Sequence, residues 1–338
     1  MYKTAIIGLG QIGYKIDEDS FRTIIWSHAK AYKKHNKTKL IAVCDIDKTS
    51  YDDFKIYYPN IDFYDDYVKM VEDVEIDIVS ICTPTPTHLD IVRNIAKSKP
   101  PKAIFIEKPM GQNLKEAIEI SKLCEKNNII LAVNYMRRWE NKYRSIKKLI
   151  DDNIMGDLYS LTAYGSTALL TSTSHLIDIF LYYGGDIAWL IGKLQKDYVR
   201  KVHGVSDKGG CAFVKFKNGA FGFLKGISKN PYNYMFEIDL LFSDGRVTIS
   251  KDGAKISIEK FTSNDKSSGS KYKTLEQIKS NEFKMIDNER MVDAVSDIIY
   301  SIETDRYTDS NGLNAIEVHR FIQNIKDSNT KGDKIIYD

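Results

Sequence analysis

A glycine-rich loop near the N-terminus has the spacing that holds a diphosphate. Gly8, Gly10 and Gly13 form a Gly-x-Gly-x-x-Gly motif, with Gln11 and Ile12 between the second and third glycines. In this motif the first glycine permits a tight turn after a strand, the second lets the backbone approach phosphate, and the third allows close packing. Backbone N–H groups of such a loop face the phosphates of a dinucleotide. We therefore predict that these five residues bind a dinucleotide cofactor.

An acidic residue ends the second apolar run of the chain. Asp45 is placed to accept hydrogen bonds from both hydroxyls of an adenine ribose, and its charge repels a 2′-phosphate, so NAD is favoured over NADP. Asp45 lies 32 residues after Gly13, instead of the ~20 that are usual. We assign the excess to an insertion over Tyr14 to Trp26. A glycine turn beside a surface carboxylate, with no ligand, is the alternative.

The loop after the fourth predicted strand is rich in threonine and proline. Ligands of open α/β sheets bind outside the carboxyl ends of the strands, and here the strand leads into residues 83–88, Thr-Pro-Thr-Pro-Thr-His. Proline stiffens an extended loop, so Thr83, Pro84 and His88 are predicted to line the cofactor groove. Two alternatives stay open: Thr87 caps the following helix, and His88 is a buried structural histidine.

An acid and a base follow the fifth predicted strand. Glu107 and Lys108 stand at this sheet edge, and Pro109 restricts the backbone of Lys108. A lysine here can reach a bound nicotinamide, and beside a cationic ring it loses its proton more readily than in water. We predict that both residues bind cofactor and that Lys108 also serves the chemistry. A solvent-exposed charge is the alternative.

Alternating short strands and amphipathic helices must position these residues. Over residues 3–134 the pattern is typical of a doubly wound parallel α/β sheet with crossover helices. The predicted strands are Thr4 to Ile7, Leu40 to Cys44, Ile61 to Tyr64, Ile76 to Ile81, Ala103 to Ile106 and Ile129 to Val133. The predicted helices are Ser27 to His35, Asp65 to Val71, Leu89 to Lys97 and Asn113 to Lys126.

The pattern changes after residue 134. Asn218-Gly219 lies between two alternating runs, 211–217 and 220–225, and predicts a hairpin with which an antiparallel sheet begins. Further strands are predicted over Met235 to Phe242, Arg246 to Ser250 and Lys255 to Glu259, and helices over Lys142 to Asp151, His175 to Tyr183, Glu282 to Glu303 and Leu313 to Asp327. The polar segment Thr262 to Lys271 is predicted to be a mobile loop.

Composition excludes several classes of protein. The chain has 338 residues and a net charge of +3, which supplies no field for gripping nucleic acid. No apolar run approaches the ~20 residues of a membrane span, and the first one ends too early for a signal peptide. The four cysteines have no Cys-x-x-Cys pair, so we expect reduced core thiols, a cytoplasmic location and no metal site.

The combination of motifs resembles a known family. The chain resembles the glucose-fructose oxidoreductase and inositol dehydrogenase (Gfo/Idh/MocA) family in the order of five motifs. These are the glycine loop, residues 42–45, Thr83-Pro84, residues 107–109 and residues 174–178. The resemblance implies a Rossmann domain over 1–134 and, over 135–338, an α/β domain with a large, open, mainly antiparallel sheet. The second domain is expected to bind substrate and to form a homodimer or homotetramer, with substrate between the domains.

The resemblance also implies catalytic roles. The motif lysine, Lys108, contacts nicotinamide and substrate, and His175 binds the reacting hydroxyl or acts as an acid or base. Asp178 lies one helical turn later and could orient the imidazole or bind a substrate hydroxyl. Many members have Asp four residues before the histidine, where this chain has Thr171. Thr171 is kept as a substrate-binding candidate, and the identity of the base stays open.

Two adjacent arginines favour an anionic substrate. Arg137 and Arg138 follow the sixth strand, and a guanidinium offers a bidentate fork to phosphate or carboxylate. Together with the resemblance, they lead us to expect an NAD-dependent oxidoreductase acting on a sugar, preferably a sugar nucleotide. A structural ion pair at the domain junction is the alternative for the arginines. For the whole protein, the alternatives are a non-catalytic NAD-binding sensor and an NAD-using glycosidase-like enzyme without net redox.

Overall fold

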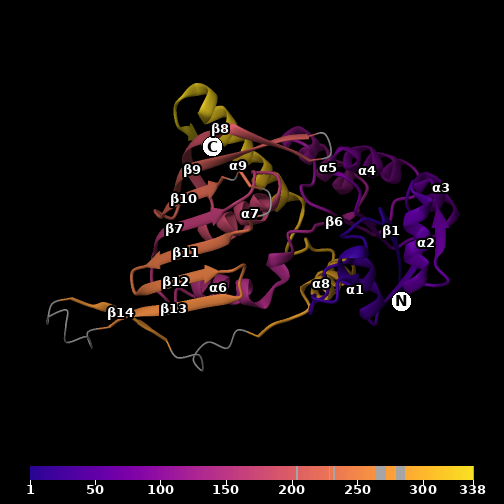
Figure 1. Ribbon diagram of the computed structural model, residues 1–338, viewed down its shortest axis with the longest axis horizontal. Helices are drawn as coiled ribbons and strands as arrows, with labels where there is room; N and C mark the ends of the chain where they lie inside the picture. The colour runs from indigo at the N-terminus through magenta and orange to yellow at the C-terminus, as the bar shows by residue number, and fades with distance from the viewer. Residues whose placement is uncertain (203–204, 228, 231–232, 263–271, 279–285, 338) are drawn as a thin grey trace. The chain divides into compact units, whose positions relative to one another are not determined.

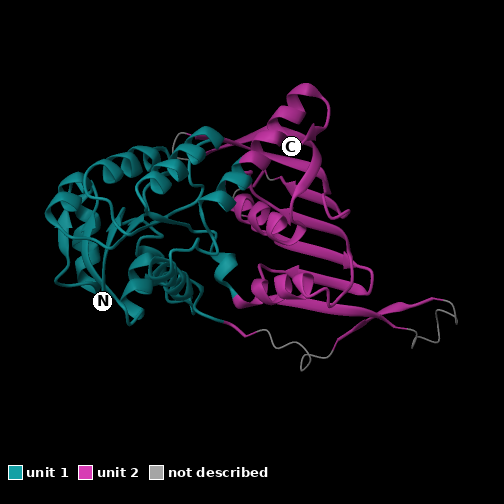
Figure 2. Ribbon diagram, turned by 180° about the vertical axis from the view of Figure 1, so that it is seen from behind, with its two compact units in different colours: residues 1–140, 288–319 teal, residues 141–287, 320–338 magenta. Residues whose placement is uncertain are grey.

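The computed structural model describes residues 1–202, 205–227, 229–230, 233–262, 272–278 and 286–337. The chain divides into two compact units, residues 1–140 with 288–319 and residues 141–287 with 320–338 (Figure 2). Cys44 and Cys124 are buried, Cys82 and Cys211 are half-buried, and all four thiols are free. Within the described ranges, none of the helices has both the length and the apolar character needed to cross a membrane.

The first unit contains the predicted parallel sheet. Its six strands run in the order β3-β2-β1-β4-β5-β6, and every neighbouring pair is parallel. The strands are β1 (Tyr2–Ile7), β2 (Thr38–Cys44), β3 (Asp62–Tyr64), β4 (Ile78–Ile81), β5 (Ala103–Ile106) and β6 (Ile130–Val133). Strands β4 and β5 are buried along their whole length, as expected for the centre of a sheet covered on both faces. This arrangement confirms the doubly wound fold and all six predicted strands.

Helices cover both faces of this sheet. They are α1 (His28–Lys34), α2 (Lys48–Tyr57), α3 (Tyr67–Asp73), α4 (His88–Lys97), α5 (Leu114–Lys126) and α8 (Arg290–Thr304), with short 3-10 turns η1 (Lys15–Glu18), η2 (Thr85–Thr87) and η3 (Met136–Trp139). Helices α4 and α5 lie on one side, and α1 and α8 on the other (Figure 1). Helix α2 was not predicted, because it buries only Phe54 and so carries no apolar stripe.

Helix α8 belongs to the first unit, which differs from the predicted division at residue 134. The apolar face of α8 joins the core that contains Trp139, and the Trp139 indole N–H donates a hydrogen bond to the buried Asp297 carboxylate (2.8 Å). The predicted helix over 282–303 begins only at Arg290; residues 282–285 lie outside the described ranges. Burial of this face is the physical reason that a late segment returns to the first unit.

The second unit is built on a nine-stranded mixed sheet. Its order is β14-β13-β12-β11-β7-β10-β9-β8-β15, and all pairs are antiparallel except β7 with β10. The strands are β7 (Leu158–Gly165), β8 (Ile187–Val202), β9 (Val205–Phe216), β10 (Phe221–Gly226), β11 (Phe236–Phe242), β12 (Gly245–Ser250), β13 (Lys255–Thr262), β14 (Thr274–Gln277) and β15 (Ile335–Ile336). The large, mainly antiparallel sheet is therefore confirmed.

The predicted hairpin joins β9 to β10, with Gly219 at φ +97° in the turn. The sheet does not begin there, because β7 and β8 precede it. Strand β8 was not predicted, because Gly192 interrupts its apolar run and its second half is polar. The glycine permits close packing, since a Cβ at Gly192 would lie 2.8 Å from the Cα of Ile325. Residues 263–271 of the predicted mobile loop lie outside the described ranges.

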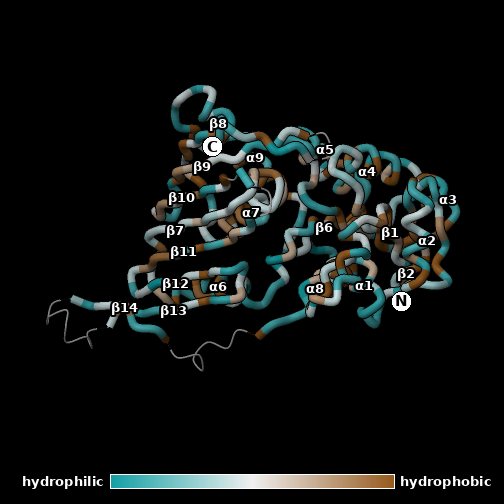
Figure 3. Tube along the Cα trace, viewed as in Figure 1, coloured by the Kyte–Doolittle hydropathy of each residue, from teal (hydrophilic) through white to brown (hydrophobic). Residues whose placement is uncertain are grey.

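Helices α6 (Asn141–Asp151), α7 (Ser172–Gly184) and α9 (Gly312–Lys331) complete the chain. Helix α7 packs on the sheet, with the Phe180 ring 5.3 Å from that of Phe216, and α6 and α7 lie on the same face (Figures 1 and 2). Hydrophobic residues recur along β9 and β10 (Figure 3). Along β10 exposed and buried positions alternate, and Phe221 and Phe223 are among the exposed ones, so part of the opposite sheet face is apolar.

Candidate active-site residues

The backbone around the glycine loop requires two of its glycines and leaves space at the third. Gly8 has φ +99°, and a Cβ there would lie 2.8 Å from the carbonyl carbon of Cys82. A Cβ at Gly13 would lie 2.3 Å from the carbonyl oxygen of Gly8. At Gly10 a Cβ would meet no described atom within 4 Å. The loop is thus tightly packed against the residues that follow β4 on one side and open at Gly10.

The open side of the loop presents hydrogen-bond donors. None of the described residues accepts a hydrogen bond from the backbone N–H of Gln11 or Ile12, and Gln11 is exposed. Donors of this kind, next to a glycine without a side chain, suit the oxygens of a diphosphate. The residues present therefore fit a dinucleotide.

The predicted insertion leaves the loop geometry intact. Residues 14–26 leave and return at adjacent points, because the His28 N–H donates to the Ile12 carbonyl (3.1 Å) and the Ala29 N–H to the Gly13 carbonyl (3.0 Å). Helix α1 therefore begins beside the glycine loop, as it would without the insertion. The extra length explains the unusual spacing between Gly13 and the second strand.

Asp45 faces the glycine loop. Its carboxylate accepts hydrogen bonds from the backbone N–H groups of Leu9 (2.7 Å) and Asp47 (2.9 Å). A carboxylate oxygen has a second lone pair, so both oxygens of this half-buried group can still accept from ribose hydroxyls. The contact with Leu9 also fixes Asp45 relative to the loop.

The loop after β4 combines an exposed and a buried part. The Thr87 hydroxyl contacts the Thr83 hydroxyl (2.7 Å) and the Pro84 carbonyl (2.9 Å), and it makes no capping hydrogen bond to α4. His88 is fully buried, with its ring nitrogens 2.9 Å from the Thr83 carbonyl and 3.1 Å from the Met110 carbonyl. Burial lowers the pKa of His88, although these carbonyls oppose the shift. This is the geometry of the structural alternative for His88.

Glu107 and Lys108 differ in their surroundings. The Glu107 carboxylate is buried and lies 3.0 Å from His28 Nε2 and 2.6 Å from Asn134 Nδ2, while Lys108 is half-buried. Burial alone raises the pKa of Glu107, but the hydrogen bonds and positive charges of its neighbours outweigh it and hold the pKa below its usual value. Glu107 is therefore an anion within a buried network, directly before Lys108.

Sequence reasoning missed the other members of this network. His28 Nδ1 lies 2.8 Å from the Ser80 hydroxyl, which lies 2.7 Å from the Tyr32 hydroxyl. All three side chains are buried. They sit on α1 and in the apolar strand β4, and nothing in their spacing indicates that they meet.

In the second unit, the candidates lie at the start of α7. His175 and Asp178 are both buried and share one helical face. The backbone N–H groups of Leu170 and Thr171 donate to the Asp207 carboxylate at 3.0 and 3.1 Å. Burial raises the pKa of Asp207 to about 6, despite these hydrogen bonds. Asp207 was not predicted, since no motif surrounds it on β9.

Arg137 and Arg138 lie in η3 of the first unit and are 3% and 8% exposed. Such burial demands hydrogen-bonded partners for both guanidinium groups. Arg138 Nη1 lies 3.4 Å from the carbonyl oxygen of Asp309. The two arginines are thus built into the interior of the structure instead of lying on its surface.

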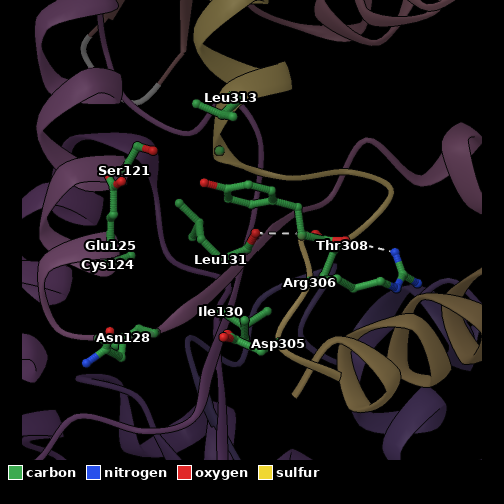
Figure 4. A pocket seen from close by; sticks show the side chains of 13 residues that line it. Ser121, Cys124, Glu125, Asn128, Ile130, Leu131, Asp305, Arg306, Thr308 and Leu313 are labelled. Carbon is green, nitrogen blue, oxygen red and sulfur yellow. Dashed lines mark hydrogen bonds between the residues drawn. The ribbon is translucent and has the colours of Figure 1, made fainter. Parts of the chain in front are cut away.

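A cavity of about 420 Å³ lies elsewhere in the first unit. It is lined by residues of α5, β6 and the segment 305–313, where the Thr308 hydroxyl donates to the Leu131 carbonyl (Figure 4). None of the predicted site residues lines it. Within the described part of the chain, no cluster of His, Cys, Asp and Glu side chains could hold a metal ion.

Comparison with known proteins indicates an NAD-binding fold, in agreement with the geometry of the glycine loop. Residues 2–135 match the model of an oxidoreductase family with an NAD-binding Rossmann fold. The chain is 25% identical to myo-inositol 2-dehydrogenase of Thermotoga maritima over 263 residues, 72% of this chain and 74% of that protein. Its fold is similar to the WlbA dehydrogenase of Bordetella pertussis in complex with NADH and UDP-GlcNAcA, with a TM-score of 0.77 and 16% identity over 100% and 99% of the two chains. A protein of Desulfitobacterium hafniense described as an NADPH-dependent oxidoreductase gives a TM-score of 0.81 at 16% identity over 99% and 97%.

Proposed function

We propose that the chain is a member of the Gfo/Idh/MocA family, whose NAD-binding oxidoreductase model matches residues 2–135, and that it transfers hydride between NAD and a CH–OH or ketone carbon of a sugar-like substrate. One observation carries the proposal. Strands β1, β4 and β5 are parallel neighbours, so the glycine loop, Thr83 and Lys108 follow them at one edge of the sheet. In open α/β folds this edge is where a dinucleotide binds.

The proposed chemistry separates a hydride from a proton. NAD, when bound, accepts or supplies the hydride. During oxidation the substrate C–H bond breaks with its electron pair, while the hydroxyl proton passes to a base. We assign the base to Lys108 and propose that His175 holds the reacting hydroxyl, with Asp178 orienting the imidazole. Thr171 then lies before the helix that carries His175, as a further substrate contact.

We propose a sugar nucleotide as the preferred substrate. The sequence argument for this choice is the pair Arg137 and Arg138, because a guanidinium pairs well with phosphate, whereas their exposures of only 3% and 8% fit the structural alternative. The WlbA dehydrogenases of Bordetella pertussis and Chromobacterium violaceum, whose folds are similar, were both crystallised with UDP-GlcNAcA. Free sugars and inositols are the competing class, represented among the relatives by several inositol dehydrogenases.

The test is a substrate panel at enzyme concentrations comparable to that of the cofactor. Protein is mixed with NAD or NADP and with nucleotide sugars, free sugars and polyols, and the near-ultraviolet absorbance of reduced nicotinamide is followed. Stoichiometric protein detects even one turnover. A signal from one compound class establishes the reaction and its substrate class. Silence across the panel in both directions, with NAD binding demonstrated, would overturn the proposed activity.

Cofactor preference is expected to depend on Asp45. The change Asp45→Asn keeps an acceptor for the Leu9 N–H but removes the charge, so NAD binding should weaken by about 10- to 100-fold, as expected for a lost charge-assisted hydrogen bond. NADP binding should improve, because its 2′-phosphate is no longer repelled. Titration with each cofactor measures both affinities.

Asp47→Asn is the matched control, since it removes an equal charge two residues away and keeps the N-cap of α2. An unchanged ratio of the two affinities in Asp45→Asn would show that this carboxylate does not face the ribose.

We propose that the exposed sheet face of the second unit packs against another copy of the chain, giving a homodimer or homotetramer. Phe221 and Phe223 are 41% and 47% exposed, and Ile191 is 41% exposed. The Phe213 ring stacks on both phenylalanines, at 5.5 and 4.7 Å between centroids. A contiguous apolar face of this kind marks a protein interface.

The change Phe223→Asp is expected to lower the mass in light scattering to that of one chain, because it buries a charge in the proposed interface. Phe21→Asp, at a phenylalanine that is 92% exposed in the first unit, should leave the mass unchanged. A wild-type protein that is a single chain at micromolar concentration would refute the proposed assembly.

A further inference from the structure

A buried hydrogen-bonded network lies behind Lys108 and has no role in the chemistry described so far. It runs from Tyr32 through Ser80 and His28 to Glu107, which Asn134 also contacts. Its residues come from α1, β4, β5 and the end of β6, and each of the five is at most 8% exposed. The network therefore ties four elements together where β5 delivers Lys108.

The direction of each hydrogen bond in this network can be assigned. Glu107 Oε1 accepts a hydrogen bond from Asn134 Nδ2, and an accepting carboxylate oxygen beside His28 Nε2 requires that this nitrogen carry a proton and donate to it. In a neutral imidazole Nδ1 is then an acceptor, which receives the Ser80 hydroxyl proton at 2.8 Å. The Ser80 oxygen in turn accepts from the Tyr32 hydroxyl at 2.7 Å. Every proton of the chain of groups has an acceptor in this arrangement.

Protonation of His28 would break the arrangement. If both ring nitrogens donated, the Ser80 oxygen would accept from Nδ1, and only one of the Ser80 and Tyr32 hydroxyl protons would keep an acceptor within this network. A buried hydroxyl without a partner is costly. The hydroxyl groups thus select one tautomer, in which Nε2–H points at Glu107.

Glu107 connects this hydrogen-bonded network to the backbone of Lys108. Its Oε1 receives two donors, His28 Nε2 at 3.0 Å and Asn134 Nδ2 at 2.6 Å, while Oε2 lies 3.3 Å from the backbone N–H of Lys108. With three donors around it, the carboxylate has one favourable position. The Glu107 carboxylate therefore fixes the position of the backbone N–H of Lys108, the next residue along the chain.

We propose that His28 is a positioning residue for Lys108: fixed in one tautomer by Ser80 and Tyr32, it holds the Glu107 carboxylate against the Lys108 backbone. The inference rests on the role proposed above for Lys108. His28 itself reaches neither cofactor nor substrate, because it is completely buried. It acts by keeping a base in the near-attack geometry that hydride and proton transfer require.

A purely structural role is the competing explanation, because the His28 ring also packs 4.3 Å from the Phe105 ring. Two substitutions separate the roles, since both remove the aromatic ring. In His28→Gln the amide nitrogen takes the place of Nε2 and can still donate to Glu107. In His28→Asn the shorter side chain takes the place of Nδ1, so Ser80 keeps an acceptor but Glu107 loses its donor.

We expect His28→Asn to lower kcat by about 10- to 100-fold, the range for loss of a hydrogen bond to a charged group, and His28→Gln to recover most of it. The KM for substrate and the affinity for NAD should change little in either variant. Melting temperatures of the two should fall alike. Equal kcat losses in both variants would overturn the proposal, because ring packing would then explain the effect.

A second measurement is independent of turnover. In ¹⁵N spectra of wild-type protein at neutral pH, His28 should show a protonated Nε2 and an unprotonated Nδ1, and Ser80→Ala should weaken this preference. Its signal is assigned as the one missing from His28→Gln. A doubly protonated ring or the opposite tautomer would refute the network as drawn. If no substrate turns over, the proposed activity fails, whereas this spectroscopic result still decides the state of His28.

Discussion

Replacing Lys108 by alanine abolishes turnover while NAD still binds: this is the largest effect we expect on activity. The side chain is half-buried at the carboxyl end of β5, so its loss opens no core cavity. The glycine loop and Asp45, which supply the proposed cofactor contacts, lie after other strands and are untouched. A general base or acid contributes typically about 10²- to 10⁴-fold in rate, so the loss should fall in or above that range.

Lys102→Ala provides the matched control. Lys102 lies just before β5, at the opposite end of the strand, where it pairs with Asp77 at 2.8 Å and is 59% exposed. An exposed ion pair contributes about 0–1 kcal/mol, so this variant should keep its activity and most of its stability. Turnover and cofactor affinity of both variants are measured side by side. Wild-type turnover in Lys108→Ala would exclude the proposed mechanism.

Two alanine substitutions in the glycine loop are expected to have opposite effects. In Gly13→Ala the new methyl group would lie 2.3 Å from the Gly8 carbonyl oxygen, a backbone atom that cannot move freely. Overpacking of this kind costs about 1–3 kcal/mol, which lowers the melting temperature by several degrees. Gly10→Ala meets nothing within 4 Å, so the protein without ligand should melt as the wild type does.

The same Gly10→Ala variant should bind NAD at least about tenfold more weakly, because its methyl group occupies the space through which the backbone approaches the diphosphate. Calorimetric melting without ligand, together with NAD titration, gives both quantities for each variant. A Gly10→Ala protein that binds NAD normally would show that the diphosphate does not lie at this loop.

The first unit was predictable because its features are local. Each strand of the parallel sheet is a short β-branched run between turn residues. In the second unit, Asn218-Gly219 identified the β9–β10 hairpin because a two-residue turn is likewise a local feature. Strand β8 and helix α8 could not be placed in this way. The length of β8 and the unit to which α8 belongs depend on packing against segments far away in the chain, such as Ile325 and Trp139.

The same distinction between local and long-range features applies to the residues of the candidate site. Gly8, Gly10, Asp45 and Lys108 stand at strand ends, where sequence position alone indicates the sheet edge. The buried partners His28 and Asp207 do not. His28 contacts Glu107, 79 residues away in the sequence, and Asp207 contacts Leu170, 37 residues away. A single sequence contains no signal for contacts over such separations.

The return of residues 288–319 to the first unit has a consequence for synthesis. The parallel sheet is complete once residue 133 has been made, yet the core around Trp139 lacks the apolar face of α8 until residue 299 has followed. At about 5–20 residues per second, this gap lasts on the order of 10 s on the ribosome. During that time the nascent first unit exposes the surface that α8 later covers, and it is then that chaperones have a target.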